Sequence, residues 1–488
     1  MIDLPSSTHV SLRRAPLAGC LAAILCLATP AAAVAATSWT VNTCDETNAG
    51  SGTTGSLRYA AANAISGDTI DMSTLTCSTI SLTTGAVTFA QANITLNGPG
   101  KNALTIESSD DRVLYHVTTS SPTGTLYVND LTVANGYLHP GLGTTARGGC
   151  IFSYGKVSLS HVGVRACRAV SVGAPVRGGG IYAKTGIFAK YSDITGNTAS
   201  NSGANANGGG GGIFTYGYAV LGNSTLSGNS APTGAGGGLR AFRDVQTIAS
   251  TISGNTAQWG GGLYAQDNLS SASDTFVLLN STVSGNLATL RVGGAQTNAG
   301  TIHVYNSTVA FNTAGSATGY GSRHYAPGFT ISDQGAYYTD PSHFQLKVVK
   351  LQSSIFSNNA YANPVATPDD IGVAKFTSNS LNSTPTSGED NLAFATTIIG
   401  LPNTLTRGVC PQLEPLRNNG GVTQTHALFG GSPAIDAGNT FATGLSPFDQ
   451  RSAPYARVSG AAADIGAYEV QQGDGIFVNG FDAPPSCI

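Results

Sequence analysis

Acidic and basic side chains are scarce in this chain, so the places where they gather are the first candidates for chemistry. Charged residues make up 10% of the 488 residues. One group falls on two neighbouring repeat units and comprises Arg240, Arg243, Asp244, Asp267 and Asp274. A polysaccharide lyase needs a base, commonly Arg or Lys, together with carboxylates that offer calcium about six to eight oxygens. This group is therefore the candidate site of a calcium-dependent lyase.

Two further groups of acids stand later in the chain. Asp369 and Asp370 are adjacent, and a glycoside hydrolase needs a pair of carboxyl groups across the sugar bond. The other group is a string of charged residues near the C-terminus: Asp436, Asp449, Arg451, Arg457, Asp464 and Glu469. Ion pairs and turn hydrogen bonds explain such a string without catalysis. Because none of these residues stands in a recognisable lyase or galacturonase motif, we expect no catalytic, cofactor-binding or metal-binding residue.

The segments that must position these side chains belong to a repeat. Residues 178–199 read GGGIYAKTGIFAKYSDITGNTA, with glycines at the start and Gly-Asn-Thr-Ala at the end. Other segments repeat this pattern at the same length or, in one copy, with a seven-residue insertion: 148–169, 210–231, 236–257, 260–288 and 293–314. With the linkers included, the period is about 24 to 33 residues, which is typical of a solenoid.

Each repeat predicts strands rather than helices. Stretches such as STLSG and STVSG alternate apolar and polar residues with the period of a strand. Glycines bound the strand segments, which leaves no room for a helix of ordinary length. A parallel β-helix remains, in which each repeat forms one coil and successive coils stack about 4.8 Å apart.

Glycine and asparagine recur at fixed places in the repeat. Glycine adopts positive φ without strain and lets neighbouring chains approach closely, so the opening glycines predict a tight corner. Asparagine is the commonest other residue to tolerate the left-handed region. One register is predicted to form a hydrogen-bonded side-chain ladder along the stack, with Cys167 in the same register of the first unit: Asn197, Asn229, Asn255, Asn286 and Asn312.

The first 36 residues are typical of a secretory signal peptide. Arg13 and Arg14 precede the apolar stretch 17–28, and the small residues 31–36 suit cleavage. This pattern predicts export by the general secretion route. No later stretch is apolar and long enough to predict a membrane-spanning helix.

Export changes how the cysteines are interpreted. Six remain after the leader, and an even number in an oxidising compartment predicts disulfides. Three pairs between sequence neighbours are the simplest of the 15 possible connectivities, and of these we expect Cys44 with Cys77 and Cys150 with Cys167. The pairing of Cys410 and Cys487 stays open. No C-x-x-C pair indicates a zinc or redox site.

An exposed solenoid end needs a cap, because it leaves apolar surface and unpaired strand edges. In residues 56–65, apolar side chains recur at helical spacing, which predicts a short amphipathic helix: Leu57, Ala60, Ala61, Ala64 and Ile65. Strands are expected from residue 68 to about residue 400 in one continuous β-helix. The predicted organisation is a signal peptide (1–36), a capped β-helix (37–410), a segment closing the solenoid (411–470) and a short flexible tail (471–488).

Two stretches resemble known families. CDETNAGSGTTGSLRYAAANAISGDTIDM followed by CSTISL resembles the N-terminal cap of secreted bacterial proteins similar to the polymorphic outer membrane proteins. Residues 413–469, which contain SPAIDAGN and DQRSAPYARVSGAAADIGAYE, resemble the choice-of-anchor Q domain family, except that Ser452 stands where that family usually has glycine. The resemblance implies a secreted or surface right-handed parallel β-helix of the all-β class. It implies no reaction that could be carried over to residues here.

Charge and repeat together favour a binding role. The formal net charge is −3 with no basic field, which argues against a nucleic-acid partner. We expect a monomeric, secreted or outer-membrane-associated adhesin-like protein that recognises polysaccharides or cell surfaces. Its contact points are expected in the variable linkers, at Arg177, Trp259 and Arg291, because Trp and Arg dominate binding hot spots. The alternative is a carbohydrate-active enzyme, a polysaccharide lyase or glycoside hydrolase, because pectate lyases and polygalacturonases share the fold.

Overall fold

All the strands that the structure describes lie between Ala36 and Ile488. The computed structural model describes residues 35–118, 124–203, 208–266, 274–316, 324–332, 348–363, 367–374, 386–396, 405–441, 446–472 and 486–487. Nearly all of the predicted signal peptide (1–36), Asp267 and most of the predicted tail (471–488) lie outside the described residues.

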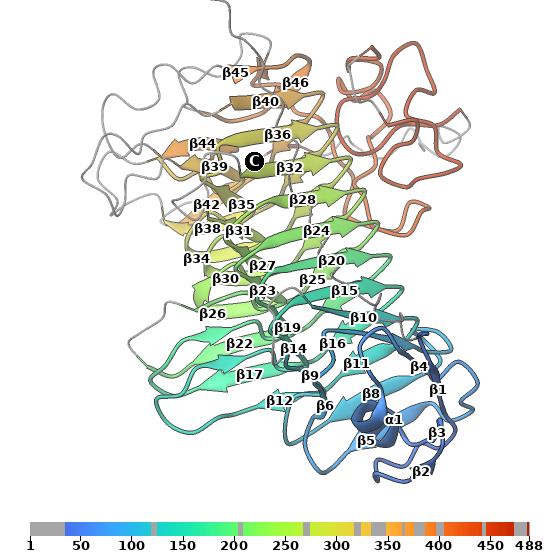
Figure 1. The fold of residues 1–488 in the computed structure, drawn as a ribbon. Helices are drawn as coiled ribbons and strands as arrows, with labels where there is room; N and C mark the ends of the chain where they lie inside the picture. The colour runs from blue at the N-terminus through green and yellow to red at the C-terminus, as the bar shows by residue number, and fades with distance from the viewer. Residues whose placement is uncertain are drawn as a thin grey trace, which may run out of the picture. The chain divides into compact units, whose positions relative to one another are not determined.

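The repeat folds into one coil of a right-handed parallel β-helix. The repeat that begins at residue 178 forms β19 (Ile181–Ala183), β20 (Gly186–Lys190), β21 (Asp193–Thr195) and β22 (Thr198–Asn201). Each strand pairs in parallel with its counterparts in the preceding and following coils. Four long sheets result, here named sheet A (through β20), sheet B (through β21), sheet C (through β19) and sheet D (through β22) (Figure 1). The predicted fold class is confirmed, and right-handed crossovers are the rule for parallel strands.

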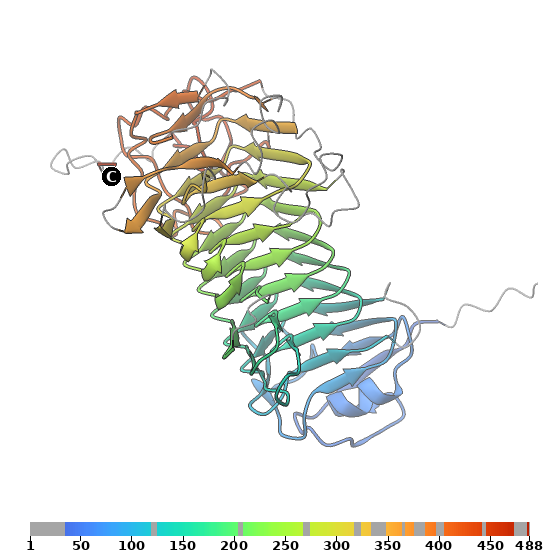
Figure 2. The same cartoon turned by 90° about the vertical axis from the view of Figure 1, so that its left-hand side faces the viewer.

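The strands of each sheet follow one another along the stack, as Figure 2 shows from the side. Sheet A contains β1 (Ser38–Val41), β2 (Gly50–Ser51), β3 (Thr54–Gly55), β4 (Thr69–Asp71), β7 (Asn93–Asn97), β10 (Thr125–Asn129), β15 (Lys156–Ser160), β20, β24 (Tyr218–Gly222), β28 (Val245–Ile248), β32 (Thr275–Leu279), β36 (Thr301–Tyr305), β40 (Val348–Gln352) and β45 (Thr386–Ser387). Sheet B contains β5 (Thr79–Leu82), β8 (Thr105–Ser108), β11 (Thr132–Ala134), β16 (Gly163–Arg165), β21, β25 (Thr225–Ser227), β29 (Thr251–Ser253), β33 (Thr282–Ser284), β37 (Thr308–Ala310), β41 (Ile355–Ser357), β46 (Asn391–Ala393) and β47 (Leu405–Arg407). Sheet C contains β6 (Val87–Phe89), β9 (Leu114–His116), β14 (Ile151–Ser153), β19, β23 (Ile213–Thr215), β27 (Leu239–Ala241), β31 (Leu263–Ala265), β35 (Ala295–Thr297), β39 (Phe329–Ser332) and β44 (Ile371–Ala374). Sheet D contains β12 (Tyr137–Leu138), β17 (Arg168–Ser171), β22, β26 (Ser230–Ala235), β30 (Thr256–Trp259), β34 (Leu287–Arg291), β38 (Thr313–Ser316), β42 (Ala360–Asn363) and β43 (Thr367–Pro368), and a separate pair is formed by β13 (Ala146–Arg147) and β18 (Val176–Arg177).

The core runs through the middle of the coils. In β20, Ile187 and Ala189 are buried whereas Phe188 and Lys190 are exposed, as the alternation of a strand requires. The inward positions of sheet A share one register and are at most 1% exposed: Leu126, Val157, Ile187, Ala219, Val245, Phe276, Ile302 and Val349. A slip of one residue would turn such a row outward, so burial fixes the register.

The glycines that open a repeat are required by close approach of the chain. Gly178 has φ 77°, and a Cβ there would lie 2.1 Å from the carbonyl oxygen of Ile181. A Cβ on Gly179 would lie 2.3 Å from the carbonyl oxygen of Gly211 in the next coil. At the later corner, the left-handed residue is Gly254, with φ 62°, rather than Asn255. The tolerance of asparagine for this conformation is therefore not used at Asn255, because the preceding glycine already turns the chain.

The predicted asparagine ladder is present. The backbone N–H and Nδ2 of Asn255 both donate to Oδ1 of Asn286, at 3.0 and 2.9 Å. Nδ2 also donates to the carbonyl oxygen of Leu226 in the preceding coil, at 2.8 Å. Both ladder bonds recur from Asn197 through Asn312, and at the N-terminal end the N–H of Cys167 donates to Oδ1 of Asn197.

The N-terminal end is capped by α1 (Leu57–Asn63), seen at the blue end in Figure 2. Ser56 begins the helix, because its Oγ accepts a hydrogen bond from the N–H of Tyr59. The helix ends at Asn63, so Ile65 leaves the apolar face and is 47% exposed, contrary to prediction. Strands also begin before residue 68, because β1 precedes the helix and pairs with β4.

Three disulfides link the described cysteines. The two predicted pairs are present, Cys44 with Cys77 and Cys150 with Cys167. The pair that the sequence left open, Cys410 with Cys487, is also bonded.

The segment after the last coil lies along the outside of sheet B, where the orange and red loops of Figure 1 run beside the coils. Its hydrogen bonds reach several successive coils, through Asn223, Thr251, Thr282, Thr308 and Ser353. The prediction that this segment closes the end of the solenoid therefore needs correction. Its polar side chains find partners in the outward hydroxyl and amide groups of the coils.

Candidate functional site

One side of the solenoid carries arginine and tryptophan at matched positions of successive coils. Arg147 in β13 pairs with Arg177 in β18, and Trp259 in β30 pairs with Arg291 in β34. We call these four residues the arginine row. Because neighbouring strands lie about 4.8 Å apart, the row places large cationic or aromatic groups along the stack. Three of the four were predicted as contact points, and Arg147 was missed.

The arginine row is interrupted by two small residues, which occupy the matching positions of the two coils between Arg177 and Trp259. Gly209 and Ala235 lie in turn between Arg177 and Trp259. Arg240 reaches this stretch from the neighbouring sheet, because its Nη1 donates a hydrogen bond to the carbonyl oxygen of Gly208 at 2.5 Å. Cationic groups therefore continue from one half of the row to the other.

Sheet C adds a column of aromatic rings beside the arginine row. The middle residue of each three-residue strand faces outward, because its neighbours on both sides face the core. These middle residues share one register: Tyr115, Phe152, Tyr182, Phe214, Arg240 and Tyr264. The rings of Phe152, Tyr182 and Phe214 are stacked, with centroids 5.1 and 5.8 Å apart.

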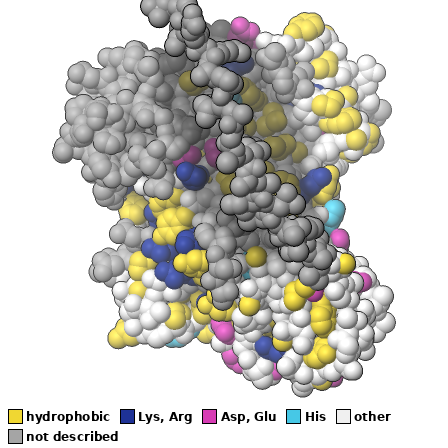
Figure 3. Space-filling view, in the orientation of Figure 1, with side chains coloured by type: hydrophobic (Ala, Val, Ile, Leu, Met, Phe, Trp, Pro, Cys, Tyr) yellow, Lys and Arg dark blue, Asp and Glu magenta, His cyan; other side chains and the backbone are white. Residues whose placement is uncertain are grey.

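The arginines lie against these rings. The Cζ of Arg147 is 5.9 Å from the ring centre of Tyr182, and that of Arg177 is 5.9 Å from Phe214. The Cζ of Arg291 lies 5.6 Å from the ring of Trp259. We call the arginine row and the column of sheet C together the arginine–aromatic face. In Figure 3, dark blue and yellow side chains gather over sheet C at the level of β19 to β27.

Two cations of the arginine row have no acidic partner in the described part of the chain. Arg147 and Arg177 form no salt bridge within the described part of the chain, and their buried Nε atoms have no hydrogen-bond acceptor there. The buried indole Nε1 of Trp259 has no acceptor among the described residues either. At the N-terminal end of this face, burial lowers the pKa of Arg112, and the positive charge of Arg147 lowers it further. An anion bound here would meet donors that the protein itself leaves uncompensated.

The structure describes four residues of the predicted calcium-dependent lyase site, and they do not form a calcium site. Oδ1 of Asp244 accepts hydrogen bonds from the N–H and Oγ1 of Thr275, at 2.8 and 2.9 Å. Arg243 is exposed, Asp274 is buried, and Arg240 belongs to the arginine–aromatic face. Within the described ranges, no group of three or more His, Cys, Asp or Glu side chains could hold a metal ion.

The adjacent acids Asp369 and Asp370 have different surroundings. Oδ2 of Asp369 lies 2.5 Å from Nε2 of His324, a pair that the sequence did not predict. Asp370 is fully buried and accepts hydrogen bonds from the N–H and Nδ2 of Asn359. Burial raises the pKa of Asp370 to about 7, against the effect of these hydrogen bonds.

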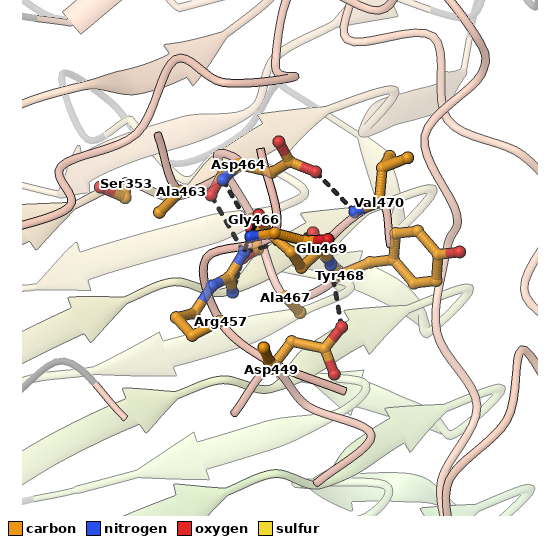
Figure 4. A network of polar contacts seen from close by, with 12 residues as sticks. Ser353, Asp449, Arg457, Ala463, Asp464, Gly466, Ala467, Tyr468, Glu469 and Val470 are labelled. Atoms are coloured by element: carbon orange, nitrogen blue, oxygen red, sulfur yellow. Dashed lines mark hydrogen bonds and ion pairs between the residues drawn. The ribbon is translucent and has the colours of Figure 1, made fainter. Parts of the chain in front are cut away.

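The charged string near the C-terminus forms a buried network within its own segment (Figure 4). Arg457 pairs with Glu469 at 2.8 Å, and Arg451 pairs with Asp449 at 2.8 Å. Backbone N–H groups occupy both carboxylate oxygens of Asp464, those of Asp436 and Val470. Burial raises the pKa of Glu469 to about 6, although Arg457 opposes the shift. With their oxygens engaged in this way, these acids hold the segment together.

An apolar pocket of about 630 Å³ lies between this segment and sheet B. Its wall includes Phe311, Leu413, Leu416 and His426. His426 is buried, with Nε2 2.7 Å from Oγ of Ser284 and Nδ1 2.6 Å from the carbonyl oxygen of Glu414. Burial lowers the pKa of His426 to about 4, so the neutral ring joins the segment to the coil.

Comparison with known proteins yields one structural likeness. No family model and no curated protein matches the chain, so the resemblance to the choice-of-anchor Q family and to the polymorphic outer membrane proteins stays a prediction. A crystal structure of pectate lyase Pel9A matches with a TM-score of 0.38 and 14% identity, covering 89% of this chain and 97% of that one. The parallel sheets described above establish the fold independently of this likeness. No helix in the described residues is long and apolar enough to cross a membrane.

Proposed function

We propose that this protein binds acidic polysaccharides along the arginine–aromatic face, with the sugar chain lying across successive coils. The observation that carries the proposal is the arginine row, whose Arg147 and Arg177 have no acidic partner among the described residues. A polymer with regularly spaced carboxylates could meet several of these cations at once.

The chemistry of the two columns suits such a ligand. Guanidinium groups bind carboxylates through paired hydrogen bonds, and cations already held against aromatic rings lose little freedom on binding. Arg147 and Arg177 are both held in this way, over Tyr182 and Phe214. Phe152, Tyr182 and Phe214 are buried, but the half-buried rings of Tyr115 and Tyr264 add apolar surface for the faces of sugar rings.

The proposal places the protein outside the cell. The three disulfides suit an oxidising compartment. Export by the general secretion route, residence at the bacterial outer membrane, membership of the choice-of-anchor Q family, a monomeric state and an adhesin-like role are parts of the proposal.

Affinity electrophoresis in gels containing polygalacturonate, alginate or a neutral glucan tests this function. We expect retardation in the acidic gels alone, weakened by added salt because surface charges are screened. The double variant Arg147→Ala with Arg177→Ala should reduce affinity at least about tenfold, since buried hot-spot arginines contribute most of the binding energy. Trp259→Ala and Arg291→Ala should also weaken binding.

Arg165→Ala is the matched control. Arg165 is 42% exposed and pairs with Asp193 on sheet B, away from the arginine–aromatic face. This variant should bind like the wild type. Equal retardation by the neutral glucan, or equal loss from Arg165→Ala and from the double variant, would contradict the proposal.

A further inference from the structure

A second line of polar side chains follows the strands of sheet C, whereas the arginine row precedes them. Each residue of this line comes directly after its strand: Tyr154 after β14, Lys184 after β19 and Tyr216 after β23. The pairing of these strands places the three residues at matched positions of successive coils. We call them the tyrosine–lysine edge. Tyr154 is 42% exposed, and the other two residues are half-buried.

The tyrosine–lysine edge meets the arginine row beside Tyr182. The Cζ of Arg177 lies 5.5 Å from the ring centre of Tyr216, and the Cζ of Arg147 lies 5.9 Å from the ring centre of Tyr182. The ring centres of Tyr182 and Tyr216 are 6.5 Å apart. Guanidinium groups that precede the strands therefore lie beside phenol rings that belong to the strands or follow them.

Lys184 brings a third cation to this place. Its Nζ lies 3.9 Å from the ring centre of Tyr154. Hydrogen bonding to Lys184 and the charge of Lys184 lower the pKa of the Tyr154 hydroxyl, and the charge of Arg147 lowers it further. Burial raises the pKa of Tyr182, whereas the charges of Arg147 and Arg177 oppose this shift. Arg147 is therefore close enough to act on the hydroxyls of both Tyr154 and Tyr182.

The protein itself uses few of these donors. Lys184, like Arg147 and Arg177, forms no salt bridge with a described residue. The hydroxyls of Tyr182 and Tyr216 have no hydrogen-bond partner in the part of the chain that the structure describes. These groups can therefore donate to a bound anion, and hydrogen bonds to charged groups are among the stronger ones in proteins.

The number and the placement of these donors suit a tetrahedral anion better than a carboxylate. A carboxylate has two oxygens in one plane, which a single guanidinium group engages through paired hydrogen bonds. The donors here come from three successive coils and from positions before, within and after the strands of sheet C. A sulfate or phosphate monoester has three terminal oxygens that point in different directions, and each accepts hydrogen bonds. Such a group can engage donors from several coils at once.

We propose that the tyrosine–lysine edge, together with Arg147 and Arg177, binds sulfate or phosphate monoester groups of the polysaccharide that lies along the arginine–aromatic face. The inference rests on the proposed function and names the acidic group that this part of the face selects. The phenol hydroxyls and Lys184 donate hydrogen bonds to the terminal oxygens, and the two arginines balance the negative charge.

Affinity electrophoresis of the full-length protein in gels with four dextrans tests the inference. The dextrans are the unmodified, carboxymethyl, sulfate and phosphate forms, the last three at one degree of substitution, so that only the acidic group differs. We expect at least one ester to bind about tenfold more tightly than carboxymethyl dextran, because a hydrogen bond to a charged group contributes about that much. The ester that binds more tightly identifies whether the group is a sulfate or a phosphate.

Tyr154→Phe removes one donor without changing the charge of the protein. It should lower the affinity for the preferred ester roughly tenfold and leave the affinity for carboxymethyl dextran unchanged. Lys184→Ala should reduce the preference in the same way. Lys190 and Tyr191 supply the matched controls, because the Nζ of Lys190 lies 5.0 Å from the ring centre of Tyr191, outside this face. Lys190→Ala and Tyr191→Phe should keep the wild-type preference.

Equal affinity of the wild type for the ester and carboxymethyl dextrans would overturn this inference and leave the proposed function intact. An ester preference that survives both Tyr154→Phe and Lys184→Ala would also overturn it. Failure to bind any acidic dextran or polyuronate would remove both proposals.

Discussion

Asn359 donates both its backbone N–H and its Nδ2 to a single oxygen of Asp370, at 3.0 and 2.8 Å. The asparagine ladder thus ends on a carboxyl group where another asparagine would continue it. Each amide of the ladder donates towards the C-terminal end, so the last acceptor has no further rung to join. An acid in this place makes the ladder sensitive to pH.

Asp370→Asn should make the stability of the fold less dependent on pH. Burial raises the pKa of Asp370 from 3.8 to about 7, so the folded protein retains a proton that the unfolded chain releases. The protonated Asp370 therefore contributes its full stabilisation of the wild type below about pH 4, and this stabilisation is lost as the pH rises to 7. Relative to the variant, its free energy of unfolding should fall by about 4 kcal/mol over this range. Urea denaturation at several pH values measures the difference, and parallel curves would contradict the prediction.

Asn255→Ala should destabilise the middle of the stack. The substitution removes an acceptor for the N–H and Nδ2 of Asn229 and leaves these buried donors unpaired. Each unpaired group costs about 1 to 3 kcal/mol, so we expect a loss of about 3 kcal/mol in the free energy of unfolding. Gln246→Ala, on the outward side of β28, is the control and should change stability little. Equal melting temperatures for the two variants would show that the ladder does not stabilise the fold.

Acid should weaken the attachment of the C-terminal segment through His426. Burial lowers its pKa from 6.5 to about 4, so the unfolded chain binds a proton that the folded protein excludes. The stabilisation is complete above about pH 6.5 and is lost as the pH falls to 4, by about 3 kcal/mol. Comparison of the wild type with His426→Gln by chemical denaturation should show a gap that grows with pH in this window. A gap that is constant or shrinks with pH would be the contrary result.

Arg457→Met should destabilise the C-terminal segment strongly. The side chain is 1% exposed and pairs with Glu469, which is fully buried. Removal of one partner leaves a buried charge uncompensated, at a cost of about 3 to 5 kcal/mol. Arg417→Ala is the matched control, because Arg417 is 59% exposed and its pair with Glu414 is worth about 0 to 1 kcal/mol. Limited proteolysis should cut 411–470 early in the first variant only. Equal resistance of both would contradict the prediction.

The repetitive part of the fold could be predicted because each coil obeys the same local rules. Equal segment lengths place Asn229 and Asn255 in one register, and the ladder bonds follow. The aromatic column was missed for a physical reason. In β19 and β23, the outward ring stands beside apolar inward residues, so the segments IYA and IFT look like continuous buried strands.

The His324–Asp369 pair could not be predicted from spacing. The two residues are 45 positions apart and lie beyond the last regular repeat, where the register is no longer visible in the sequence. The C-terminal segment posed a similar problem. Its buried acids could be interpreted as structural, but its position along sheet B depends on contacts with coils more than 100 residues away, such as Thr251 with Gln424.

The segment that crosses several coils also has a mechanical consequence. Hydrogen bonds between coils run along the stack, so a pull on its two ends would load every junction in series, and the weakest junction would open first. Bonds through Asn223, Thr282 and Ser353 fasten the same segment to separate coils. Part of the tension at one junction is therefore carried by this segment to the neighbouring coils. A protein that holds a long polymer under flow would be protected in this way from splitting between coils.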